Sequence, residues 1–129
     1  MSPAKYKIIR IALGLAPEDV AEKFGVQVRS AKRWETVNEP PAPVVEWVTG
    51  LYERYQQVIE QTLENVDMME SEHGLTEVYE LSVYESEDSL RRAMGDDMTL
   101  RMHNTLVGHI VMAFGDLDAV NVGYVPEEL

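Results

Sequence analysis

The sequence contains no cysteine, and this absence excludes disulfides and thiolate-bound metal sites. It also has no apolar run of about 18 residues, the length that suggests a membrane-spanning helix, so no membrane partner is expected. The first residues lack the layout of a signal peptide, because Lys5, Lys7 and Arg10 interrupt their apolar positions. We therefore expect a cytoplasmic protein.

Motifs of the common enzyme classes are also missing. The sequence has no G-x-S-x-G nucleophile motif, no Walker phosphate-binding loop and no G-x-G-x-x-G dinucleotide motif. Its carboxylates are abundant but scattered, so no acid–base pair stands out. His103 and His109 do not align on one helix face, and His73 has only Glu70 at a ligand-compatible spacing. We expect no enzyme activity, no cofactor and no metal.

The whole chain has a net charge of -12, and positive charge is scarce outside its N-terminal part. Of the 11 lysines and arginines, seven lie in residues 1–36 with four acids, a formal charge of about +3. Residues 37–129 hold four cations and nineteen acids, a formal charge of about -15. Such asymmetry is typical of a nucleic-acid-binding face at one end, with an acidic remainder that DNA repels. Alternatively, the acids simply keep the C-terminal part soluble, and both explanations can hold together.

Hydrophobic periodicity and capping residues predict helices throughout the first half of the chain. Serine or alanine followed by proline begins the first two helices, and Gly14 and Gly25 end them. The long helix that follows the prolines has an apolar stripe, which needs a second helix to cover it, from this chain or another copy. The expected elements are helices over residues 3–13, 17–24, 27–36 and 43–72, with a proline-rich linker over residues 40–43.

The pattern then changes to a mixture of strands and helices. Alternating side chains from Val78 to Tyr84 predict a strand, and Ser86 begins a short helix. We expect the methionines of this region to be mainly core filler, with some at a dimer interface. The expected elements are strands over residues 78–84, 98–100 and 120–125, and helices over residues 86–94 and 102–113. The methionines are Met68, Met69, Met94, Met98, Met102 and Met112.

Residues 17–35 have the features of a helix-turn-helix. Its two helices pack at a steep angle, so their closest approach needs a small side chain, which Ala21 supplies. Gly25, four residues later, allows the tight turn. A helical hairpin without a DNA-binding role can share this pattern. The apolar inner side is expected to consist of Val26, Ala31 and Trp34.

The second helix of this motif places its cations on one side. With Ala31 and Trp34 inward, a helical wheel puts Arg29, Lys32, Arg33 and Thr36 outward. Arginine can donate two hydrogen bonds to guanine in the major groove, and lysine can do the same or bind a phosphate. The alternative is a solvated basic face. The predicted contacts to the DNA backbone come from Gln27, Ser30 and Lys23.

Glu35 would repel phosphate if it were exposed beside these cations. We therefore expect it to turn inward and to form a structural ion pair with Arg10 of the first helix. Trp34, next to it, is expected in the core and not as a ring that contacts DNA.

Pro17–Glu35, with RSAKRWE at its end, resembles the phage-repressor and Cro type of helix-turn-helix regulator. The long helix, the strand at Val78–Tyr84 and LRMHNTLVGHIVMAF (Leu100–Phe114) make the chain similar to the anti-CRISPR-associated transcriptional autoregulators. The resemblance implies a homodimer made by the C-terminal part, with two recognition helices that read an inverted repeat. The marked acidity and the Pro-Pro-Ala-Pro linker depart from this pattern.

The sequence thus predicts a mainly α-helical protein in three parts. Residues 1–39 form a helix-turn-helix DNA-binding domain core, residues 40–43 a linker, and residues 44–129 a long helix plus a small α+β dimerisation region. The expected function is a dimeric transcriptional repressor of its own or a neighbouring operon, bound to double-stranded DNA. The alternative is an acidic protein-interaction module, such as an antitoxin or an inhibitor that mimics nucleic acid.

Overall fold

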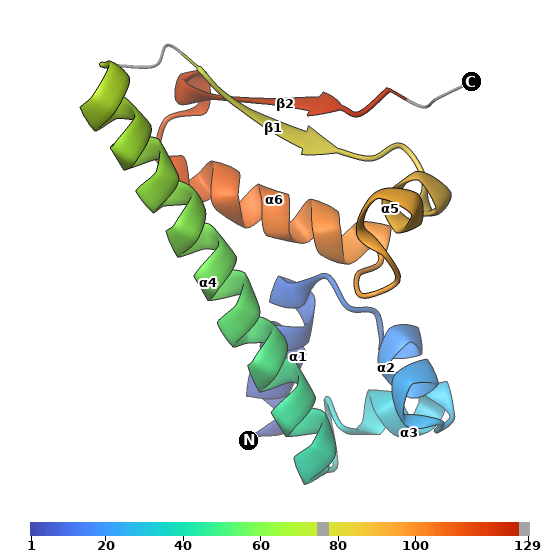
Figure 1. The fold of residues 1–129 in the computed structure, drawn as a ribbon. Helices are drawn as coiled ribbons and strands as arrows, with labels where there is room; N and C mark the ends of the chain where they lie inside the picture. The colour runs from blue at the N-terminus through green and yellow to red at the C-terminus, as the bar shows by residue number, and fades with distance from the viewer. Residues whose placement is uncertain (75–77, 127–129) are drawn as a thin grey trace. The chain divides into compact units, whose positions relative to one another are not determined.

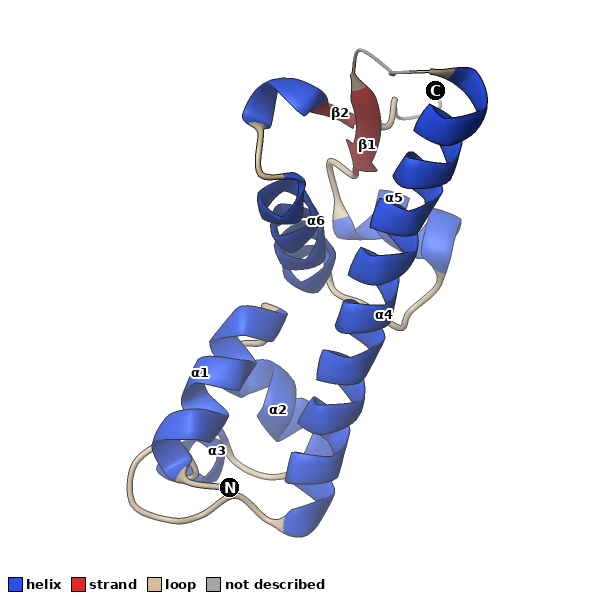
Figure 2. Cartoon of the chain, turned by 90° about the vertical axis from the view of Figure 1, so that its left-hand side faces the viewer, coloured by secondary structure: helices blue, strands red, loops and turns tan. Residues whose placement is uncertain are grey.

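A computed structural model describes residues 1–74 and 78–126 of the chain. The fold is mainly helical, with a small two-stranded parallel sheet in the C-terminal part (Figures 1 and 2). Within the described residues, no helix combines the length and apolar character needed to cross a membrane. The elements are α1 (Pro3–Leu13), α2 (Pro17–Phe24), α3 (Val28–Arg33), α4 (Ala42–His73), β1 (Tyr79–Val83), α5 (Glu87–Met94), α6 (Leu100–Phe114), the 3-10 helix η1 (Leu117–Ala119) and β2 (Val120–Tyr124).

Local capping explains why α1 and α2 begin and end where the sequence predicts. The Ser2 hydroxyl accepts a hydrogen bond from the Lys5 N–H at 3.2 Å at the start of α1. At the start of α2, where Ala16 has no capping group, the Asp19 carboxylate accepts from the Ala16 N–H at 2.7 Å. Gly14 ends α1 with a φ of 77°, a left-handed conformation that glycine adopts at little cost.

The α3 helix is shorter than predicted, because it ends at Arg33 and not at Thr36. The N–H groups of residues 34–36 donate to carbonyls three residues earlier, at 3.1–3.3 Å, so the chain continues as a tighter helical turn. The Asn38 N–H then donates to the Arg33 carbonyl at 2.9 Å, which closes the turn. Thr36 therefore lies in this turn, beyond the α-helix.

The chain forms two compact units, Met1–Tyr55 and Gln56–Leu129. Their boundary lies inside α4 and not at the proline linker. The α4 helix begins at Ala42, one residue before its predicted start and inside the predicted linker over residues 40–43. The boundary lies inside α4 because the first half of this helix completes the N-terminal core, where the Tyr55 hydroxyl donates to the Leu13 carbonyl at 2.7 Å. Burial raises the pKa of the Tyr55 phenol above its ordinary value. The buried apolar residues of this unit are Tyr6, Leu13, Leu15, Val20, Ala21, Ala31, Val44, Val48, Leu51 and Tyr55.

In the C-terminal unit, β1 and β2 pair in parallel, with Tyr79 opposite Val120 at one end and Val83 opposite Tyr124 at the other. Between them in sequence come α5 and α6, and α6 lies beside β1 (Figure 1). The Tyr79 and Phe114 rings, 5.7 Å apart, connect the strand to the end of α6.

The predicted strand over residues 98–100 is wrong, because this segment instead caps α6. The Thr99 hydroxyl accepts from the Met102 N–H at 3.2 Å, and the Glu87 carboxylate accepts from the Leu100 N–H at 3.0 Å. These bonds satisfy N–H groups that a helix leaves unpaired in its first turn.

His103 makes the stability of the C-terminal unit sensitive to pH. Its ring is buried against Tyr84, with 5.4 Å between centroids, and its Nδ1 has no hydrogen-bond partner among the described residues. Burial lowers the pKa of His103 below its usual 6.5, because it penalises the charged ring. The unfolded chain therefore binds a proton at a higher pH than the folded one, and stability falls as pH drops below about 6.5 until the lowered pKa is passed.

We therefore expect wild type to lose stability relative to His103→Gln between pH 7.5 and pH 5, by at most about 1.4 kcal/mol per pH unit in this window. The His103→Gln variant shares every other titrating group, so it removes the effect of the many carboxylates. Urea unfolding of both proteins at the two pH values measures the difference. If the difference in unfolding free energy between wild type and His103→Gln is the same at both pH values, the assignment to His103 is contradicted.

Candidate nucleic-acid interface

The candidate site is built on α2 and α3, which pack against each other through small side chains. Ala21 of α2 is 4% exposed and Ala31 of α3 is 1% exposed, so each helix has a small side chain among its buried residues. Gly25 ends α2 with a φ of 64°, and the Val26 N–H returns to the Ala21 carbonyl at 3.0 Å. The turn between the helices is thus short and closed by backbone hydrogen bonds.

The polar side of α3 is exposed, and it carries the cations that the sequence analysis selected. Arg29, Lys32 and Arg33 are all exposed, and none of them forms an ion pair among the residues that the structure describes. Gln27 is the N-cap residue of α3, but its side chain does not cap the helix. The remaining predicted contact residues are also exposed, namely Lys23, Gln27, Ser30 and Thr36.

The ion pair expected between Arg10 and Glu35 is present in the structure. Arg10 Nη2 donates to Glu35 Oε1 at 2.7 Å, and the two side chains are only 11% and 7% exposed. Arg10 Nη1 donates to the Leu15 carbonyl, in the loop between α1 and α2. The guanidinium of Arg10, on α1, therefore binds both the turn that follows α3 and the loop that precedes α2. Beside it, burial, with a smaller contribution from the Glu35 charge, raises the pKa of Tyr6 to about 12.

A second cluster, which sequence reasoning missed, connects α2 to α4. The Phe24 and Trp47 rings meet edge to face, with centroids 5.6 Å apart. The Lys23 ammonium lies 5.8 Å from the centroid of the Trp47 ring, within the range of a cation–π interaction. Trp47 follows Val44 by three residues, so the apolar stripe marks it as inward-facing, but nothing in the sequence pairs it with α2.

Trp34 directly follows the last residue of α3 and is half-buried, so it lies only partly in the core where it was expected. The Lys23 side chain, predicted to contact the DNA backbone, is exposed while its ammonium lies over Trp47.

In the ranges 1–74 and 78–126, no three histidine or acidic side chains are grouped to hold a metal ion.

No protein-family model and no curated protein matches this chain.

Proposed function

We propose that the chain is a sequence-specific DNA-binding transcriptional regulator, a dimeric repressor that occupies an inverted-repeat operator. The observation that carries this proposal is the exposed side of α3, where Arg29, Lys32 and Arg33 lie together and free of carboxylate partners among the described residues. In a chain with a net charge of -12, a group of three exposed cations without carboxylate partners favours an anionic partner over a solvated basic face.

In this proposal α2 and α3 form the helix-turn-helix, and α3 enters the major groove. Arg29, Lys32 and Arg33 contact base edges, with Thr36 at the margin of the groove. Their charge also attracts phosphate, whatever the sequence. Contacts to the DNA backbone, which set the register but do not read sequence, come from Lys23, Gln27 and Ser30.

Three features support this assignment of α3. The helix contacts α2, and Ala21 and Ala31 are both buried, so this packing sets the orientation of α3. The Arg10–Glu35 pair holds the turn that follows it, and the same pair removes the carboxylate that would repel phosphate. The proposal includes membership of the phage-repressor and Cro type of regulator that the sequence resembles. In this proposal the protein represses by occupying a promoter and catalyses no reaction.

Replacing Arg29 with alanine tests the proposed base contact. We expect the variant to lose about 1–3 kcal/mol of affinity for its operator, while its affinity for unrelated DNA falls less. Mobility shifts on the DNA that flanks its own gene, with scrambled DNA as competitor, measure both. Arg101→Ala is the matched control, because it removes an exposed arginine from the C-terminal unit. Unchanged operator affinity in Arg29→Ala would rule out this residue as a base reader.

A further inference from the structure

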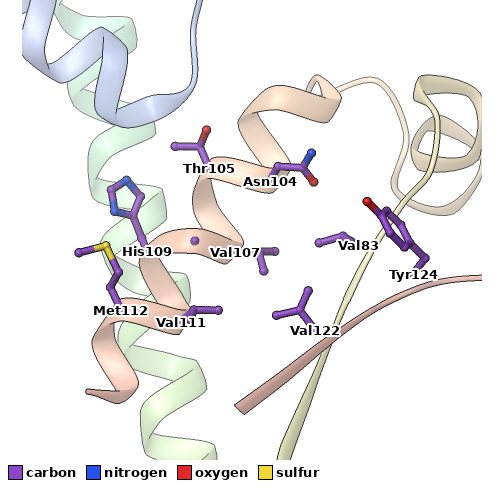
Figure 3. A pocket seen from close by; sticks show the side chains of 10 residues that line it. Val83, Asn104, Thr105, Val107, His109, Val111, Met112, Val122 and Tyr124 are labelled. Atoms are coloured by element: carbon purple, nitrogen blue, oxygen red, sulfur yellow. The ribbon is translucent and has the colours of Figure 1, made fainter. Parts of the chain in front are cut away.

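A groove of about 570 Å³ lies beside α6 in the C-terminal unit. Figure 3 shows that α6 forms one wall of this groove and that the strands β1 and β2 form the other. Its volume is within the range of small-molecule sites, about 300–1,000 Å³. The side chains that point into the space between the two walls are Asn104, Val107 and Val111 from α6, and Val83, Val122 and Tyr124 from the strands.

The opposite side of α6 contributes only the outer edge of the groove. Thr105, His109 and Met112 also border it, but Figure 3 draws them on the side of the helix that faces away from the strands. Met112 is 79% exposed there. The prediction that the methionines mainly fill the core is therefore wrong for Met112, and it is also wrong for three others, Met68, Met69 and Met94.

The groove is apolar and uncharged. Four valines line it, and none of its residues is a lysine, arginine, aspartate or glutamate. Residues 37–129 hold four cations and nineteen acids, so this uncharged surface lies in a part of the chain that is rich in charge. A charged ligand would lose its hydration in the groove without gaining a counter-charge. The lining therefore favours a neutral ligand and excludes a polyanion such as DNA.

Two polar side chains approach each other at one end of the groove. In Figure 3 the Asn104 carboxamide and the Tyr124 hydroxyl point toward each other across that end. Neither side chain forms a hydrogen bond with another residue in the described part of the chain. A carboxamide and a phenol can each donate and accept hydrogen bonds. A neutral ligand group that also donates and accepts, such as a carboxamide, therefore matches this pair.

Gly108, in the middle of α6, leaves room beside the helix backbone. Its φ is outside the left-handed region, and in a helix interior glycine is less favourable than alanine. A Cβ added at this position would meet no atom within 4 Å, so the packing of the protomer does not require a glycine here. Because Gly108 borders the groove, its missing side chain lets a bound molecule approach the backbone closely.

We propose that this groove binds a neutral small molecule with an apolar body and a polar end of the carboxamide kind. The body lies against the valines of α6 and of the strands, and the polar end is held between Asn104 and Tyr124. These residues all belong to the C-terminal unit, whereas α3 belongs to the N-terminal unit. The site can therefore be tested without DNA, and its failure would leave the proposed function untouched.

Titration of isotope-labelled protein with two matched probes tests the ligand class. Phenylbutanamide and phenylbutanoate have the same size, but only the second is charged. The amide is expected to shift the backbone N–H signals of Val107, Val111 and Val122 in nuclear magnetic resonance spectra, with a dissociation constant of about 1 mM, as for a ligand of about twelve non-hydrogen atoms. The carboxylate should bind at least about 10-fold more weakly, because it is desolvated without a counter-charge.

Both titrations are made in about 1 M salt, which screens the acidic surface of the unit and so removes its long-range repulsion of the carboxylate. No shift with the amide, or equal affinity for the two probes, would overturn the proposal.

Gly108→Leu tests the position of the site without disrupting the fold. Leucine favours a helix, and the space around the Cβ accepts it. Its side chain occupies the edge of the groove, so phenylbutanamide should bind at least about 10-fold more weakly. Ala113→Leu is the matched control, because it places leucine at an exposed position of α6 outside the groove, and its affinity should equal that of wild type. Circular dichroism confirms that both variants are folded. Equal binding by Gly108→Leu and wild type would overturn the site.

Two further variants test the polar end. Tyr124→Phe removes only a hydroxyl and Asn104→Leu removes the carboxamide, and each is expected to weaken the binding of phenylbutanamide by about two- to tenfold. Unchanged affinity in both would overturn the role of this pair. Sedimentation identifies a competing occupant. If wild type is a dimer that Gly108→Leu dissociates, and the amide does not bind, a second copy covers the groove and the proposal is overturned.

Discussion

Glu35→Ala is expected to lower the free energy of unfolding of the N-terminal unit by about 3–5 kcal/mol. The substitution leaves the Arg10 guanidinium buried without its carboxylate, and Arg10 Nε has no hydrogen-bond partner among the described residues. Both tryptophans, Trp34 and Trp47, lie in this unit, so denaturant unfolding followed by tryptophan fluorescence reports on it directly.

A double variant separates the cost of an unpaired charge from the loss of packing. Removing both charges, in Arg10→Met with Glu35→Leu, should recover part of the lost stability, because no buried charge is left unpaired. Recovery stays incomplete, since the Leu15 carbonyl also loses its donor. If Glu35→Ala changes the free energy of unfolding by less than about 1 kcal/mol, the ion pair does not stabilise the N-terminal unit as proposed.

Replacing Arg29, Lys32 and Arg33 together with alanine is expected to abolish specific DNA binding. Operator affinity should fall by about 10³-fold or more, to the level of non-specific binding, because specific recognition by such proteins exceeds non-specific binding by at least that factor. The exposed side chains bury nothing in the core, so the unfolding free energy should change little. Titration of labelled operator DNA, followed by fluorescence anisotropy, measures the loss.

The control for this variant removes the same number of charges from the other unit. Arg91, Arg92 and Arg101 are exposed on α5 and α6, and their replacement by alanine gives the same net charge as the α3 variant. Its operator affinity should stay within several-fold of wild type. An equal loss in both variants would mean that net charge, and not the α3 surface, determines DNA binding.

The N-terminal elements could be predicted because their signals are local. Ser2 caps α1, and Gly14 and Gly25 adopt the left-handed conformation that ends α1 and α2. The Arg10–Glu35 pair was predicted for a different reason, because an exposed Glu35 beside the α3 cations would repel phosphate and was therefore expected to turn inward.

Long-range features could not be predicted in the same way. The parallel pairing of β1 with β2 joins segments some forty residues apart, and an alternating pattern identifies a strand without identifying its partner. The strand predicted at residues 98–100 is wrong because threonine is favoured both in strands, as a β-branched residue, and at helix N-termini, as a cap. In this structure the Thr99 hydroxyl accepts a hydrogen bond from the Met102 N–H and caps α6. Trp47 was missed because its contacts with Phe24 and Lys23 depend on how α4 packs against α2.

The salt dependence of DNA binding tests the central claim most directly. Wild-type protein should bind the DNA that flanks its own gene more tightly than scrambled DNA, and the logarithm of its affinity should fall linearly with the logarithm of salt, with a slope of about -0.9 for each phosphate neutralised. The α3 triple variant should show a shallower slope. Absence of any binding even at low salt would contradict the account and favour the alternative, an acidic protein-interaction module.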